Sequence, residues 1–263
     1  MININPESSA HWYTADGKPQ HDATLREARK QRLYPSVTTI QKVFAKPGLD
    51  AWKLQQAILS ALTLPRNPGE SDDDFASRVV KDMGEETKQA ANRGTIIHDM
   101  INHRLVNGVW PAPLVEKHML APWTMVLETW INRNVKKVYI SEKVVVHPSG
   151  YAGTVDLVAE TAWAEGPVVI DFKNQRVADG KKPKFYPEYC AQLAAYRQAL
   201  GTPQMMEKYS LPSAPVATAS VVINREKPEP PYVNHWGPEE TVTQLEMFWL
   251  AHRAWSLSKN YHI

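Results

Sequence analysis

Three β-rich segments in close succession constrain the fold more than any other feature of this chain. Residues 138–147 and 151–160 are rich in β-branched side chains and are separated by Pro148-Ser149-Gly150, a pattern that predicts a β-hairpin. The run VVIDF at 168–172 predicts a third strand, buried at the centre of a sheet. Because helix-compatible segments lie on both sides of these strands, we expect an α/β fold with a central mixed sheet flanked by helices.

The remaining segments are expected to be mostly helical. Residues 33–62 indicate an extended stretch and two helices broken at 46–48, with Asp50 as the N-cap of the second. The Pro-rich and acidic stretch 63–74 predicts a loop. Four further helices and one late strand are expected, with residues 111–122 irregular: helices at 74–105, 125–135, 189–200 and from Pro238, and a strand at 216–224.

This pattern divides the chain into three expected parts. Residues 1–85 form a helical N-terminal extension, residues 86–237 the sheet-containing core, and residues 238–263 a C-terminal helix packed on that core. The C-terminal helix carries an aromatic and apolar stripe that favours core packing over base stacking: Leu245, Phe248, Trp249, His252 and Trp255.

Composition limits the classes of cofactor and the location. The single cysteine, Cys190, cannot form an internal disulfide or supply the four thiolates of an iron–sulfur cluster, so oxygen and nitrogen must bind any cofactor. No stretch approaches the roughly 20 apolar residues that span a bilayer. The N-terminus has neither a basic start nor an apolar block, and we expect a cytoplasmic protein without a membrane partner.

The charge pattern permits a polyanionic partner without requiring one. The net charge is +2 and the pI is near 8.5. A basic cluster at Lys181, Lys182 and Lys184 follows the third strand, and it is either a contact for a DNA backbone or an ordinary solvated surface.

Two aspartates and a lysine carry the chemical signal. Asp156 and Asp171 fall on adjacent expected strands, and Lys173 points to the same side of its strand as Asp171. A carboxylate beside an apolar strand is costly unless a cation compensates it. Hard oxygen ligands select Mg²⁺ or Mn²⁺, and a nearby ammonium can orient the attacking water. The alternative is a plain ion pair at a strand end.

Four motifs occur in an order that resembles the PD-(D/E)XK nucleases of the RecB-type branch. They are His98 in RGTIIH (93–98), Gly153 to Asp156, Asp171 to Lys173, and Gln192 to Tyr196. The resemblance implies a restriction-endonuclease-like core in which His98, Asp156, Asp171 and the carbonyl of Phe172 bind Mg²⁺ or Mn²⁺. It also implies that Lys173 assists the water and that Gln192 and Tyr196 orient this lysine or touch a phosphate. In isolation, His98 would be a helix-edge histidine.

The resemblance extends toward the N-terminus and suggests an activity. PSVTTI and KPGLDAW are similar to stretches of viral and mitochondrial exonucleases of this branch, which implies a metal-dependent DNA exonuclease of phage-type recombination or replication. A structure- or site-specific endonuclease and a vestigial DNA-binding module are the alternatives. A single-strand annealing partner and an oligomer are expected by analogy only.

Two further residues are candidates for DNA contact. Arg93 precedes Gly94 and either holds a phosphate or forms an ion pair on the helix surface. Glu142 lies in the strand before Asp156 and has either a role in the site or an ordinary exposed position. No helicase P-loop is present, so we expect a nuclease that is not fused to a helicase.

Overall fold

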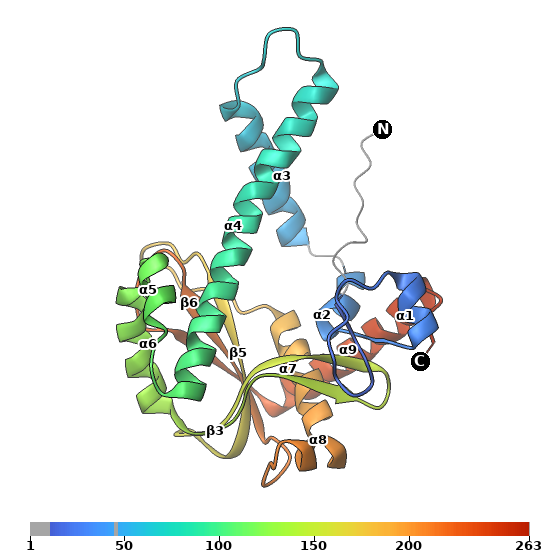
Figure 1. The fold of residues 1–263 in the computed structure, drawn as a ribbon, viewed down its shortest axis with the longest axis vertical. Helices are drawn as coiled ribbons and strands as arrows, with labels where there is room; N and C mark the ends of the chain where they lie inside the picture. The colour runs from blue at the N-terminus through green and yellow to red at the C-terminus, as the bar shows by residue number, and fades with distance from the viewer. Residues whose placement is uncertain (1–10, 45–46, 263) are drawn as a thin grey trace.

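A five-stranded mixed sheet forms the centre of the computed structural model, which describes residues 11–44 and 47–262 (Figure 1). The strands lie in the order β3-β4-β5-β6-β7, and only β5 and β6 run parallel. The expected mixed α/β sheet is therefore confirmed. Its strands are β3 (Val135–His147), β4 (Tyr151–Thr161), β5 (Ala164–Gln175), β6 (Ala217–Asn224) and β7 (Tyr232–Trp236).

The expected hairpin and central strand are both present. β3 and β4 pair antiparallel with His147 opposite Tyr151, and the turn between them contains Gly150 at a φ of 88°. β5 lies between β4 and β6 and is fully buried from Pro167 to Phe172. Because β5 has a neighbour on both sides and helices on both faces, its long apolar run is stable only at this central position.

The two faces of the sheet bury separate apolar clusters. Val155 and Val169 contact the cluster that includes helices α7 (Pro187–Leu200) and α9 (Pro238–Ser258). Leu157 and Ile170 contact the cluster that includes α4 (Asp72–Asn107) and α6 (Ala121–Asn134). Since side chains alternate along a strand, Asp171 and Lys173 face α7, whereas Phe172 and Asn174 face α4.

Two predicted helix faces are confirmed. Ile97 and Ile101 of α4 are buried, and Leu105 packs against the same cluster. In α9, Phe248 and Trp255 are buried and Leu245 and Trp249 pack against them, so the aromatic stripe belongs to the core. α9 begins at Pro238, where the missing N–H of proline costs nothing.

The first described residues pack on the core rather than extending from it. A two-stranded sheet, β1 (Trp12–Tyr13) with β2 (Tyr34–Pro35), touches β4 through a bridge between Ser36 and Ala152. The turns around it are α1 (Leu25–Gln31), α2 (Val37–Ile40) and the 3₁₀ turn η1 (Gln41–Val43). This segment therefore lies beside the hairpin β3–β4.

α3 (Pro47–Thr63) and the first half of α4 form a helical hairpin that projects from the rest of the molecule (Figure 1). Residues 64–71 connect them as the expected loop, and the Ser71 side chain accepts a hydrogen bond from the backbone of Asp74 to cap α4. α4 is continuous through residue 85, where the N-terminal extension was expected to end.

Three local expectations were wrong or incomplete. Residues 111–122 are not irregular, because α5 (Ala112–Lys117) forms there and α6 already begins at Ala121. Each of these helices has proline in its first turn, where proline favours a helix start rather than a break.

Asp50 is not an N-cap, since α3 starts at Pro47 and Asp50 lies inside its first turn. Lys46, in the expected break, lies outside the described residues. The short helix α8 (Pro203–Lys208) and strand β7 were not anticipated.

Within the described part of the chain, no helix is long and apolar enough to span a membrane.

Candidate metal centre

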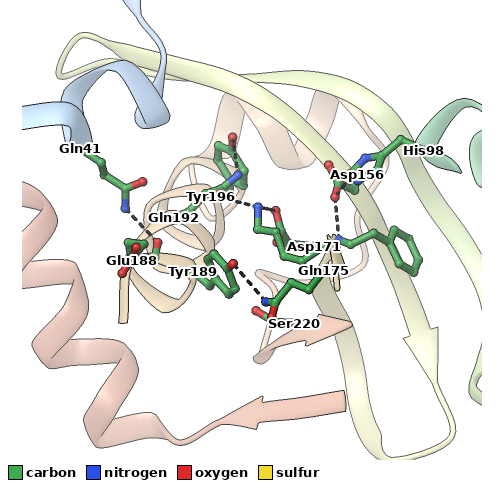
Figure 2. Close-up of polar contacts among 12 residues, drawn as sticks. Gln41, His98, Asp156, Asp171, Gln175, Glu188, Tyr189, Gln192, Tyr196 and Ser220 are labelled. Atoms are coloured by element: carbon green, nitrogen blue, oxygen red, sulfur yellow. Dashed lines mark hydrogen bonds and ion pairs between the residues drawn. The ribbon is translucent and has the colours of Figure 1, made fainter. Parts of the chain in front are cut away.

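Adjacent antiparallel strands bring the two aspartates together. The register pairs Leu157 of β4 with Ile170 of β5, so the next positions along the two strands are Asp156 and Asp171. The backbone N–H of Phe172 donates a hydrogen bond of 2.7 Å to Oδ2 of Asp156 (Figure 2). The backbone of the neighbouring strand β5 thus fixes the orientation of the Asp156 carboxylate.

Three side chains from three elements form a group that could hold a metal ion. One possible ligand atom from each of His98, Glu142 and Asp156 lies within 4.8 Å of the other two. Nδ1 of His98 is 3.3 Å from Oε1 of Glu142 and 3.6 Å from Oδ2 of Asp156. The ligand group therefore combines two carboxylates, which suit hard ions such as Mg²⁺ or Mn²⁺, with one imidazole, which suits softer divalent ions better.

Glu142 reaches this group through an unusual backbone conformation. Its φ is 48°, in the left-handed region that a glutamate rarely adopts, although it lies within strand β3. The pairs Ser141 with Leu157 and Lys143 with Val155 place Glu142 directly across from Asp156. Such conformations cost about 1–3 kcal/mol and cluster at functional sites.

The charges of this group are strongly coupled. Burial alone would lower the pKa of His98, but Asp156, together with the hydrogen bond and charge of Glu142, outweighs burial and raises it to about 9. Burial and the nearby charge of Asp171 raise the pKa of Asp156 to about 7. The two carboxylates thus favour the protonated form of His98.

Asp171 pairs with the lysine instead of joining the ligand group. Its Oδ1 accepts a 2.8 Å hydrogen bond from Nζ of Lys173, while its Oδ2 is buried and has no hydrogen-bond partner. The Asp171 side chain is only 3% exposed. A bare, buried carboxylate oxygen is costly, so this atom is a candidate for a ligand that the chain itself does not provide.

Lys173 carries a partly buried ammonium that is held from several sides. Burial lowers its pKa, but the charges of Asp171 and Asp156 outweigh burial and raise the pKa above the ordinary value. Nζ also donates to Oε1 of Gln192 at 3.1 Å. Nε2 of Gln192 in turn donates a 3.3 Å hydrogen bond to the hydroxyl of Tyr196, and Figure 2 shows these two side chains next to each other on α7. Gln192 and Tyr196 are one helical turn apart on α7, as their spacing predicts.

Gly153 allows Tyr196 to reach the sheet. A Cβ atom at Gly153 would lie 2.6 Å from Cε1 and 2.8 Å from the hydroxyl of Tyr196, closer than real Cβ contacts occur. Only glycine therefore fits at this point of β4. This explains physically why a glycine stands three residues before Asp156.

A cavity of about 530 Å³ opens in front of these residues. His98, Glu142, Gln192 and Tyr196 line one part of it. The N-terminal segment supplies much of the rest, with His11, Tyr13, His21, Ser36 and Thr38. The sequence did not predict that the N-terminal segment lines this cavity. The signal that pointed to it was the PSVTTI stretch, whose residues 36 and 38 line the cavity.

The other candidate residues lie around the centre. The guanidinium of Arg93 stacks 4.9 Å from the ring of Trp123, and its Nε is buried without a partner. Asn174, which the sequence did not single out, also has both amide atoms buried and unpaired. The ring of Phe172 packs on His98 at 6.3 Å, and Lys181, Lys182 and Lys184 are exposed.

Comparison with known proteins leaves the family open. No protein-family model and no curated protein matches the chain. The crystal structure of SSO0001 aligns with 53% of this chain at 13% identity and a TM-score of 0.23. The aligned part spans 61% of that protein's own length, and at this similarity it carries no argument about fold or function.

Proposed function

We propose that this protein is a metal-dependent DNA exonuclease that hydrolyses phosphodiester bonds from DNA ends. The observation that carries the proposal is the position of the His98–Glu142–Asp156 ligand group beside the Asp171–Lys173 pair. In metal-assisted phosphodiester hydrolysis a bound cation polarises the phosphate, and a fixed positive charge close by can offset the charge that develops; these five side chains would offer both. A phage-type recombination or replication role in the bacterial cytoplasm is part of the proposal.

The residues fit a divalent cation such as Mg²⁺ or Mn²⁺. His98, Glu142 and Asp156 would hold it, and the buried, unpaired Oδ2 of Asp171, opposite Asp156 on the neighbouring strand, is a further candidate oxygen. When bound, such an ion polarises a phosphate and lowers the pKa of a coordinated water. To become a ligand, His98 must give up the proton that its carboxylate neighbours stabilise.

The remaining side chains orient the reaction. Lys173 is kept charged by Asp171 and fixed by Gln192, so its ammonium can orient a water or offset charge that develops on the phosphate. The basic loop with Lys181, Lys182 and Lys184, together with Arg93, would contact the sugar–phosphate backbone. The preference for ends rests on the resemblance of PSVTTI and KPGLDAW to exonucleases. An annealing-protein partner and an oligomer are proposed by analogy with the nuclease family alone.

Incubation of the protein with end-labelled linear DNA and with closed circular DNA, with and without Mg²⁺, tests this function. We expect loss of end label into short products from linear DNA only, dependent on Mg²⁺ and stopped by a chelator. Cutting of circular DNA would identify an endonuclease instead. Tight binding without products under any divalent metal would identify a vestigial module.

Two substitutions connect the activity to the candidate site. Lys173→Ala and Asp171→Asn should each lower the cleavage rate by about 10²- to 10³-fold, because each removes a charge from the reacting centre. DNA binding in Ca²⁺, measured by fluorescence anisotropy, should persist. Lys117→Ala, an exposed lysine at the end of α5, is the matched control. A Lys173→Ala protein with half the wild-type rate would contradict the assigned role.

A further inference from the structure

The face of the Tyr189 ring lies beside the ammonium of Lys173. We infer that Tyr189 is a positioning residue for Lys173, and that it holds the charge of the ammonium while leaving one N–H free for the substrate. This inference rests on the proposed function and deepens it. No motif of the sequence analysis included Tyr189.

The geometry assigns each side of the ammonium a different neighbour. Nζ of Lys173 lies 5.1 Å from the centre of the Tyr189 ring, 2.8 Å from Oδ1 of Asp171 and 3.1 Å from Oε1 of Gln192. A cation within about 6 Å of a ring face is attracted by the π electrons, more strongly when it is withdrawn from water. The Lys173 side chain is 23% exposed, so most of it is withdrawn.

The Tyr189 ring attracts the ammonium of Lys173 without accepting a hydrogen bond, unlike an additional oxygen ligand. A lysine ammonium has three N–H donors, and Asp171 and Gln192 accept two of them. A third carboxylate or amide in place of Tyr189 would accept the last donor. An aromatic face attracts the whole charge without requiring that donor, which therefore stays available for a water or a phosphate oxygen.

The position of Tyr189 on α7 follows from helical spacing. Tyr189, Gln192 and Tyr196 are three and then four residues apart, so they lie on one face of α7 (Figure 2). Tyr189 and Gln192 both contact Lys173 on β5. The hydroxyl of Tyr189 accepts a 3.2 Å hydrogen bond from Nε2 of Gln175. The same Nε2 donates to the backbone carbonyl of Lys184 at 2.9 Å. The ring orientation is thereby tied to the basic loop.

If Tyr189 had only a packing role, its removal would have different effects. Tyr189 also packs against the apolar cluster that contains α7 and α9, so its removal can cost stability without affecting catalysis. A residue that only packs would change the melting temperature but not the turnover number. A residue that positions Lys173 would change kcat while KM for DNA stays the same.

Steady-state kinetics on linear DNA separates the two roles. Tyr189→Leu removes the ring and should lower kcat by about 3- to 30-fold at constant KM, whereas Tyr189→Phe keeps the ring and should stay within about twofold of wild type. Tyr186→Leu removes the neighbouring exposed tyrosine, whose ring meets that of Tyr189 edge-on, and serves as control. An unchanged kcat in Tyr189→Leu, or an equal loss in Tyr189→Phe, would overturn the inference.

A second measurement does not depend on nuclease activity. In lysine-labelled protein, the side-chain proton signals of Lys173, assigned with Lys173→Ala, should be shifted upfield by the ring current of Tyr189. Tyr189→Phe should keep this shift and Tyr189→Leu should abolish it. If the wild type does not cleave DNA, the proposed function fails while the spectra still decide the position of the ring. Absence of the shift in wild-type protein would overturn the inference even if cleavage is found.

Discussion

At the scale of single residues, two aspartates of similar sequence context have different surroundings. Asp156 accepts the Phe172 N–H and faces His98, whereas Asp171 faces Lys173 and keeps one oxygen unpaired. The two carboxylates are therefore suited to different tasks, the first to metal binding with His98 and Glu142 and the second to fixing Lys173. The sequence predicted both aspartates as site candidates, but it did not predict which partner each carboxylate has. Those partners come from α4, β3 and α7.

The raised pKa of His98 predicts a pH-dependent contribution to stability. Because the folded protein raises this pKa from 6.5 to about 9, protonated His98 stabilises the fold fully below pH 6.5, and this stabilisation is lost as the pH rises through about 9. In EDTA, the free energy of unfolding of His98→Gln should therefore fall below that of wild type at pH 6.5 and approach it above pH 9.

Urea unfolding at a series of pH values measures this difference. His118→Gln, which removes a histidine at the end of α5 outside the ligand group, is the control for the loss of a histidine as such. A difference between wild type and His98→Gln that does not change with pH would show that His98 acts through packing alone.

At the scale of secondary structure elements, the site depends on how closely α7 approaches the hairpin β3–β4. Gly153 in β4 lies against the Tyr196 ring, Tyr196 contacts Gln192, and Gln192 contacts Lys173. A change in the separation of α7 and β4 therefore reaches the lysine through two side chains. Helix and strand were each predictable from periodicity, whereas the separation between them was not.

Gly153→Ala tests this packing. The added Cβ would meet Cε1 of Tyr196 at 2.6 Å, so the ring has to move, and overpacking of this kind typically costs about 1–3 kcal/mol. We expect a lower free energy of unfolding and a reduced cleavage rate. Because the closest atom is a ring carbon, adding Tyr196→Phe in the same chain should not restore either property.

The matched control is the same substitution at Gly84 in α4. Nothing lies within 4 Å of a Cβ built there, and alanine is favoured over glycine inside a helix by about 1 kcal/mol. Gly84→Ala should therefore stabilise the protein. A Gly153→Ala protein as stable as wild type would show that Tyr196 is free to move and does not fix Gln192.

At the scale of the whole molecule, segments far apart in the sequence meet at one cavity. The N-terminal segment contributes His11 and Ser36, α4 contributes His98, and α7 contributes Gln192. The same helix α4 forms one arm of the projecting hairpin and, further along, carries His98 (Figure 1). The hairpin is therefore directly connected to the site. The basic loop 176–186 follows the end of β5 at Gln175, two residues after Lys173.

Electrostatic contact between that loop and DNA predicts a salt dependence. Replacing Lys181, Lys182 and Lys184 together with alanine should weaken binding equally for all sequences and reduce the slope of log K against log salt by up to about three units. Anisotropy titrations at several salt concentrations measure this slope. Since the three side chains are exposed, their removal should leave the fold intact. An unchanged slope would identify the cluster as an ordinary solvated surface.

The sequence by itself determined the α/β class, the hairpin and the buried central strand, and it singled out Asp156, Asp171 and Lys173 as candidate site residues. These follow from local physics, because strand and helix periodicity and the cost of a carboxylate in an apolar strand can be evaluated within a short window. Periodicity does not measure distance between elements. Only the tertiary structure decided that Glu142 joins His98 and Asp156, that Tyr189 lies beside Lys173, and that the N-terminal segment lines the cavity, because strand register and helix docking bring those residues together.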